Sequence, residues 1–187
     1  MERGYSMGFK GAAIALFTVA GVVATSGTAE AAALPSYEQW QADVKQVMDP
    51  AIPWLEQRVA QGGENLAIVL DIDNTSLETE YHKGEPNKPV LAVARWAKDH
   101  DMAVLFVTAR SFSGKARGDL AKAGYEVDEI CTRGLIERFG KAKARCRKDL
   151  AEQGYTITAN IGNRDTDFQG GGFEKEYKLP DYDGELS

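Results

Sequence analysis

Short apolar runs alternate with amphipathic stretches along most of the chain. Runs with the length and character of strands buried on both faces occupy residues 66–70, 102–107, 127–131 and 155–161. Amphipathic or charged stretches that predict helices occupy residues 36–48, 51–61, 89–99, 114–123 and 140–153. This alternation predicts an α/β fold, a Rossmann-like parallel sheet with helices on both faces, in one domain over residues 34–187.

The first 33 residues have the pattern of an export signal. A positively charged segment that contains Arg3 and Lys10 precedes an uncharged apolar run over residues 11–24. The small residues that follow, up to Ala31 and Ala33, suit cleavage by a signal peptidase. At ~1.5 Å per residue this run spans roughly 21 Å, less than the ~30 Å hydrocarbon core of a bilayer. We therefore expect residues 1–33 to be a signal peptide, the protein to be secreted or extracytoplasmic, and no stable membrane anchor to remain after cleavage.

Export changes how the two cysteines are interpreted. In an oxidising compartment Cys131 and Cys146 are able to form a disulfide, and the alternative is two separate buried thiols. The sequence leaves both possibilities open, because it does not give the distance between the two Cα atoms.

Composition narrows the chemistry. The chain has 22 Lys and Arg, 28 Asp and Glu, a formal net charge of −6, two His and two Cys. The acidic balance argues against nucleic acid as a partner. Two His and two Cys are too few for a multi-histidine or Cys₄ zinc site. Catalysis, where present, is therefore expected to depend on carboxylates.

Polar residues follow three of the predicted strands, at the carboxyl ends where open α/β sheets bind their ligands. These segments are Asp71-Ile-Asp73-Asn-Thr75, Thr108-Ala-Arg110 and Gly162-Asn163-Arg164-Asp165-Thr166-Asp167. Asp71 and Asp73 are two residues apart, so on an extended chain both point to one side and require a cation or a shared proton. Asp71 and Asp167 are the natural pair for Mg²⁺, while Thr108 and Lys143 suit the oxygens of a phosphoryl group.

These segments, in this order, resemble the four motifs of the haloacid dehalogenase (HAD) superfamily. The four motifs are Asp71–Thr75, Phe106–Thr108, Lys143 and Gly162–Asp167. The surrounding sequence is most similar to the HAD acid phosphatases of the class B and plant vegetative-storage-protein type. The similarity covers roughly residues 36–182, and about a dozen residues between Thr75 and the next helix imply a small cap or none.

The resemblance implies a role for each motif residue. Asp71 is the nucleophile that forms an aspartyl-phosphate, and Asp73 protonates the leaving group and then activates water. Thr108 and Lys143 bind the phosphoryl group, and Mg²⁺ is held by Asp71, the backbone carbonyl of Asp73, and Asp167. The implied protein is a secreted, Mg²⁺-dependent acid phosphatase that acts on small phosphomonoesters.

One residue departs from the family pattern. The last motif commonly begins Gly-Asp, and here Asn163 replaces that first acid. Its amide oxygen is still able to bind Mg²⁺, with one negative charge fewer. This departure supports an alternative function, a catalytically weak HAD-fold storage or binding protein.

Other interpretations of single residues stay open. Lys141 is the alternative to Lys143 as catalytic lysine, and most of the basic residues between 133 and 148 are expected on a solvated helix face. Arg110 is placed to reach either a substrate phosphate or a neighbouring acid. His82 and His100 are expected at the surface. The segment beginning at Asp165 partly matches a calcium loop, but a predicted strand precedes it where such a loop requires a helix.

Overall fold

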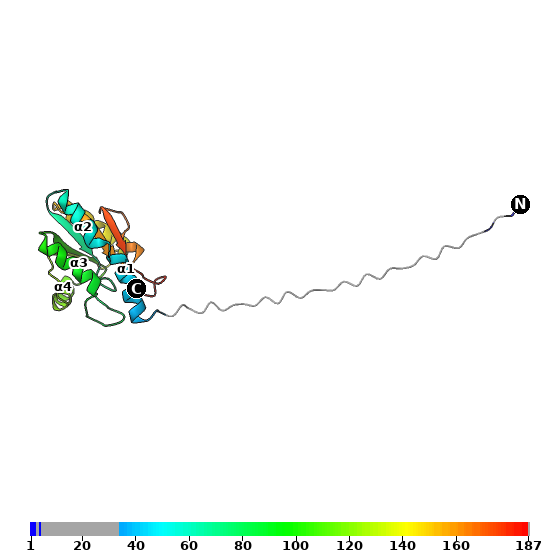
Figure 1. Ribbon diagram of the computed structural model, residues 1–187, viewed down its shortest axis with the longest axis horizontal. Helices are drawn as coiled ribbons and strands as arrows, with labels where there is room; N and C mark the ends of the chain where they lie inside the picture. Colours follow the sequence, from blue (N-terminus) through cyan, green and yellow to red (C-terminus); the bar gives the residue numbers. More distant parts are fainter. Residues whose placement is uncertain (3, 5–33, 187) are drawn as a thin grey trace. The chain divides into compact units, whose positions relative to one another are not determined.

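The computed structural model describes residues 1–2, 4 and 34–186 (Figure 1). The helices are α1 (Tyr37–Met48), α2 (Ala51–Ala60), α3 (Lys88–Asp99), α4 (Ser113–Lys122) and α5 (Phe139–Glu152), with one 3₁₀ turn, η1 (Asp165–Asp167). The strands are β1 (Leu66–Leu70), β2 (Ala103–Thr108), β3 (Glu129–Thr132), β4 (Thr156–Gly162) and β5 (Lys175–Lys178). The run predicted as the core of a signal peptide, residues 11–24, lies outside the described residues. Within the described part of the chain, no helix is long and apolar enough to cross a membrane.

All strands run parallel in one sheet, in the order β3-β2-β1-β4-β5. The predicted Rossmann-like α/β fold is confirmed. The central strand is β1, in which every residue is buried, and Leu70 pairs with Phe106 of β2 and Ile161 of β4. Strand β5 is not predicted from the sequence, because its four mostly charged residues carry no apolar periodicity. It is a polar edge strand in which only Tyr177 is buried.

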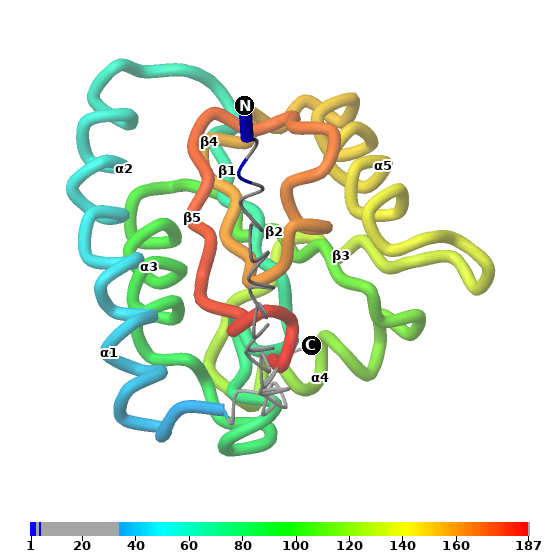
Figure 2. The backbone as a smooth tube through the Cα atoms, turned by 90° about the vertical axis from the view of Figure 1, so that its right-hand side faces the viewer, coloured from blue at the N-terminus to red at the C-terminus, as the bar shows by residue number. Residues whose placement is uncertain are grey.

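The two faces of the sheet are covered unequally. Ile68 and Leu70 pack into the large core with α1 to α4, whereas Ala67 and Val69 pack into a smaller cluster with α5. Figure 2 shows α1, α2 and α3 together on one side of the strands and α5 on the other. Because side chains alternate along a strand, the next odd-numbered residue, Asp71, continues on the α5 side.

The helix boundaries follow local sequence signals. The hydroxyl oxygen of Ser36 accepts a hydrogen bond from the backbone N–H of Gln39 at 3.2 Å, which caps α1 as predicted. The predicted break between the first two helices occurs at Asp49 and Pro50. No named helix or strand lies between β1 and α3, and the intervening loop is closed by a bridge between Leu77 and Pro86. This agrees with the small or absent cap that the sequence predicts.

The two cysteines form a disulfide. Cys131 of β3 and Cys146 of α5 have Cα atoms 5.7 Å apart and are 15 residues apart in sequence. The structure thus resolves the alternative that the sequence left open. The bond ties α5, the only long helix on its face of the described sheet, to strand β3.

Replacing both Cys131 and Cys146 with alanine is expected to lower the free energy of unfolding by about 3 kcal/mol, the loop-closure term for about 15 residues. Urea denaturation monitored by circular dichroism measures the difference. The variant should no longer respond to a reductant that destabilises the wild-type protein. Equal stability of wild-type protein with and without reductant would contradict the prediction.

Candidate active site

Asp71 lies at the carboxyl end of the central strand and is buried. Its backbone N–H donates to the carbonyl of Ile161 at 2.9 Å, so Asp71 is held against the end of β4. Its own carbonyl accepts a hydrogen bond from the hydroxyl of Ser76 at 2.6 Å. The backbone on both sides of Asp71 is therefore fixed, and its carboxylate points to the face covered by α5.

Lys143 joins two of the predicted site residues. Its Nζ donates to Asp71 Oδ1 at 2.7 Å and also to Asp167 Oδ1, and all three side chains are almost fully buried. The structure therefore brings Lys143, and not Lys141, to the nucleophile position that the sequence predicts. Two carboxylates share one ammonium, so this group of three side chains carries one uncompensated negative charge when both acids are ionised.

A second basic residue of α5 holds the loop that carries Asp167. Arg147 is buried, and its guanidinium donates to the backbone carbonyls of Asp167, Gln169 and Gly171. The side-chain amide of Asn160 donates to the same Asp167 carbonyl at 2.8 Å. These bonds fix the polypeptide on which the Asp167 carboxylate is mounted.

Gly162 allows Asp167 to approach the end of β4. A Cβ atom at Gly162 would lie 2.5 Å from the Cβ of Asp167, closer than real side chains come. The Asp167 carboxylate also accepts a hydrogen bond from the backbone N–H of Arg164 at 2.8 Å, which closes the η1 turn. A side chain at position 162 would displace Asp167 from Lys143.

Burial has the largest effect on the protonation of Asp71. Removal from water raises the pKa of Asp71 to about 7, against the attraction of Lys143 and with the repulsion of Asp167 adding to the rise. Burial alone would lower the pKa of Lys143, but the two carboxylates raise it above its ordinary value. The lysine is thus held as a cation between the two acids.

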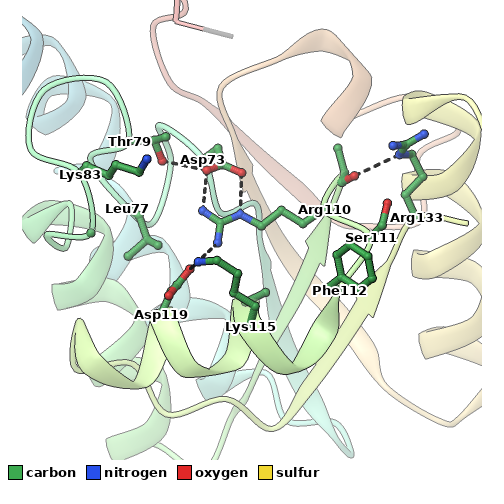
Figure 3. Close-up of a pocket in the computed structure, with 13 residues that line it drawn as sticks. Asp73, Leu77, Thr79, Lys83, Arg110, Ser111, Phe112, Lys115, Asp119 and Arg133 are labelled. Carbon is green, nitrogen blue, oxygen red and sulfur yellow. Dashed lines mark hydrogen bonds and ion pairs between the residues drawn. The ribbon is translucent and has the colours of Figure 1, made fainter. Parts of the chain in front are cut away.

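Asp73 is engaged by Arg110. The guanidinium donates from Nη2 to Asp73 Oδ1 at 2.6 Å and from Nε to Asp73 Oδ2 at 2.9 Å (Figure 3). The Thr79 hydroxyl donates to Asp73 Oδ1 at 2.8 Å, and Arg110 Nη1 also donates to Asp119 at 3.0 Å. Burial would raise the pKa of Asp73, but the hydrogen bonds and charge of Arg110 outweigh it and hold that pKa below its ordinary value. Of the two predicted options for Arg110, the structure shows pairing with neighbouring acids.

The remaining predicted residues lie at the same end of the sheet. Asn163 is buried, and its Nδ2 donates to the Leu186 carbonyl at 2.7 Å while its Oδ1 accepts from the Thr75 hydroxyl at a long 3.4 Å. Thr108 is buried at the end of β2, where its hydroxyl accepts from the Arg110 backbone N–H at 3.2 Å. Among the described residues, no hydrogen bond joins Thr108 to Asp71 or Lys143.

The donor set near Asp71 fits a hard cation. The described residues contain no group of three or more His, Cys, Asp or Glu side chains that could hold a metal. Asp71 and Asp167 nevertheless contact the same ammonium nitrogen. The amide nitrogen of Asn163 is used on Leu186, and its oxygen accepts only the long hydrogen bond from Thr75. Two carboxylates with amide and backbone oxygens are ligands that Mg²⁺ accepts.

The contacts of Arg147 with the Asp167 loop are not predicted from the sequence, in which most basic residues of this segment are expected on a solvated helix face. Lys148 and Arg145 of the same helix are indeed exposed or half-exposed. The available signal was the four-residue spacing between Lys143 and Arg147, which places both on one helical face. The surface prediction holds for His82 and His100, which are exposed. His82 pairs with buried Glu78, and His100 stacks on Trp96.

The comparisons with known proteins agree with this geometry. The sequence profile of the family described as HAD superfamily, subfamily IIIB (Acid phosphatase), matches residues 17–88 and 80–185. The chain belongs to this family. Its fold resembles that of the class C acid phosphatase from Bacillus anthracis, with a TM-score of 0.61 and 18% identity over 78% of this chain and 79% of that one. A search of curated proteins finds no significant match.

Membership in the subfamily IIIB acid phosphatases confirms the resemblance predicted from the four motifs. The structural neighbour supports the fold. The finer similarity to the plant vegetative-storage-protein type stays a prediction.

Arg147→Ala should lower the free energy of unfolding by about 2–4 kcal/mol, because three backbone carbonyls lose a charged donor in a buried setting. Lys148→Ala, one residue further along the same helix and exposed, should change it by less than about 0.5 kcal/mol. Urea denaturation of both variants tests the difference. Similar losses for the two variants would show that Arg147 does not hold the Asp167 loop.

The metal-free protein should lose part of its stability as the pH rises towards 7. The pKa of Asp71 is about 7 in the folded chain and 3.8 as an ordinary side chain. Between these values the folded state binds the extra proton, so this contribution falls with rising pH. The stability of wild-type protein minus that of Asp71→Asn should therefore decrease from pH 4.5 to 7.5 in EDTA. A difference that stays constant over this range would contradict the assignment.

Proposed function

We propose that this subfamily IIIB protein is a secreted, Mg²⁺-dependent acid phosphatase that hydrolyses small phosphomonoesters through an aspartyl-phosphate on Asp71. The observation that carries the proposal is the buried contact of Lys143 with both Asp71 and Asp167. A structural protein has no need to bury two carboxylates on one ammonium at a strand end, since burial of charge is costly. The motif similarity to the class B and plant vegetative-storage-protein group supports the same assignment.

The proposed reaction has two steps. A carboxylate oxygen of Asp71 forms a bond to phosphorus as the ester P–O bond breaks, and the leaving oxygen takes a proton from Asp73. Water then attacks the same phosphorus and gives its proton to Asp73, and the bond to Asp71 breaks to release inorganic phosphate. Lys143 and the Thr108 hydroxyl bind the phosphoryl oxygens.

The environment of Asp73 favours one of its two roles. Arg110 keeps its pKa low, so Asp73 is ionised and suited to take a proton from water. Its role as an acid requires it to gain a proton first, which weakens the pairing with Arg110. An acidic medium favours that protonation, in keeping with an acid phosphatase.

Mg²⁺ is the proposed cofactor. Asp71, Asp167, Asn163 and the Asp73 backbone carbonyl would hold it, and the ion would neutralise charge on the phosphoryl group. Because Asn163 replaces an acid, this ligand set carries one negative charge fewer, and we expect weaker Mg²⁺ affinity than an aspartate at this position would give.

We also propose that the protein is exported. The signal pattern in residues 1–33 supports this, and so does the Cys131–Cys146 disulfide, because disulfides persist mainly in oxidising compartments. The catalytically weak storage or binding protein remains the second candidate, supported by Asn163 alone.

Hydrolysis of p-nitrophenyl phosphate between pH 5 and 7 tests the enzyme proposal. Turnover is expected with Mg²⁺ and should be abolished by EDTA. Asp71→Asn should lower kcat by about a thousandfold or more, because the nucleophile is removed. Asp165→Asn is the control, since Asp165 is an exposed acid in the loop that carries Asp167 and pairs with Lys178.

The alternative outcomes separate the two candidates. Absence of turnover with Mg²⁺, alongside a folded protein, would favour the storage or binding function. Turnover that Asp71→Asn leaves unchanged would overturn the nucleophile assignment.

A further inference from the structure

A second, larger cavity adjoins the candidate active site. The cavity that contains Asp71, Lys143 and Asn163 has a volume of about 250 Å³. A cavity of about 670 Å³ lies beside it, and the two share Asp73, Thr79 and Ala109 in their walls. Asp73 is the proposed proton donor to the leaving group, so the larger cavity is on the side where the leaving group would lie.

The larger cavity is cationic in an otherwise acidic protein. Four basic side chains line it, Lys83, Arg110, Lys115 and Arg133. Only two carboxylates line it, those of Asp73 and Asp119. Arg110 pairs with both acids and Lys115 pairs with Asp119. Both acids are therefore already paired, and the other two basic residues, Lys83 and Arg133, form no ion pair with them.

The two remaining cations form no ion pair with any described residue. Arg133 helps to lower the pKa of Glu137, but that carboxylate is paired with Arg145. Arg133 donates to the backbone carbonyls of Ala109 at 3.1 Å and Glu137 at 3.2 Å and forms no ion pair. Lys83 forms neither a hydrogen bond nor an ion pair with any described residue. Figure 3 shows the two on opposite sides of the cavity, with the Asp73–Arg110 pair between them.

Lys83 is mounted on an ordered loop. The backbone N–H of Glu78 donates to the Glu85 carbonyl at 2.9 Å, and that of Glu85 donates to the His82 carbonyl at 2.9 Å. The buried Glu78 carboxylate also contacts His82 at 2.8 Å. These contacts surround Lys83 in the chain, so its backbone is positioned although its ammonium is exposed.

The cavity also has an apolar wall. The ring of Phe112 is 74% exposed and lies in the cavity wall below Ser111 in Figure 3. An exposed ring beside cations suits a planar group that carries a negative charge. Lys83, Arg133 and this ring have no role in the reaction proposed above.

We propose that this cavity is a leaving-group subsite that selects phosphomonoesters whose leaving group itself carries an anion, with Lys83 as a specificity-determining residue. The inference rests on the proposed phosphatase function and adds the substrate class to it. The overall charge of −6 disfavours a second anion at long range, so a preference for one has to come from these local cations.

Two substrates of equal shape test the proposal. 4-Carboxyphenyl phosphate and 4-carbamoylphenyl phosphate differ at the far end of the ring by one negative charge. Wild-type kcat/KM should be about two- to fivefold higher for the carboxylate, the range expected for a partly exposed ion pair. The preference should shrink as ionic strength rises.

Matched variants assign the preference to Lys83. Lys83→Gln should reduce the ratio of the two kcat/KM values to about one, through KM for the carboxylate, and leave turnover of the amide unchanged. Lys122→Gln is the control, because Lys122 is exposed at the end of α4 and does not line the cavity. Equal wild-type values for the two substrates, or an unchanged ratio in Lys83→Gln, would overturn the proposal.

Binding of the corresponding phosphonates separates this proposal from the phosphatase function. Calorimetry on the full chain with 4-carboxyphenyl- and 4-carbamoylphenylphosphonate requires no turnover. The subsite is supported if wild-type protein binds the carboxylate phosphonate more tightly than the amide and Lys83→Gln removes this difference. If neither ester is hydrolysed while this binding preference is present, only the phosphatase function is contradicted. Equal binding of the two phosphonates would overturn the subsite.

Discussion

The contact of the Lys143 ammonium with two buried carboxylates is the constraint on which the rest of the site depends. Asp71 and Asp167 come from different strand ends, and each would repel the other in a buried setting without a cation between them. One ammonium does not compensate both charges. Burial raises the pKa of Asp71, and the repulsion of Asp167 adds to the rise. The negative charge that is left when both acids are ionised explains why a further cation suits this position.

Much of the surrounding structure keeps that contact in place. Helix α5 carries Lys143 and is the only long helix on its side of the described sheet, so fewer neighbours position it than position α1 to α3. The disulfide fixes α5 to β3 at Cys146, one turn beyond Lys143. One residue after Cys146, Arg147 binds three carbonyls of the loop that carries Asp167. Residues of one helix therefore position the lysine and one of its two partners, Asp167.

The other half of the site is built around Arg110. Its guanidinium bridges Asp73 and Asp119, so it couples the protonation of Asp73 to the charge of the neighbouring cavity. In the proposed reaction, chemistry at phosphorus and recognition of the leaving group meet at the Asp73–Arg110 ion pair. No named helix or strand lies between β1 and α3, so the side chains available for recognition come from the strand ends, from α4 and from the short loop that carries Lys83.

The sequence by itself determined the central strands and the residues that end them. Leu66 to Leu70 is continuous apolar sequence, and a parallel strand buried on both faces requires that pattern, so the place of Asp71 follows from local sequence. The tertiary structure alone decided which charges meet. The family motif distinguished Lys143, but the sequence did not separate Arg147 from the exposed Lys148. Arg110 had two possible partners, and the cysteine pairing depended on a Cα distance. The periodicity of apolar residues along the sequence indicates whether a position is buried. Ion pairs and disulfides depend instead on which distant segments the fold brings together.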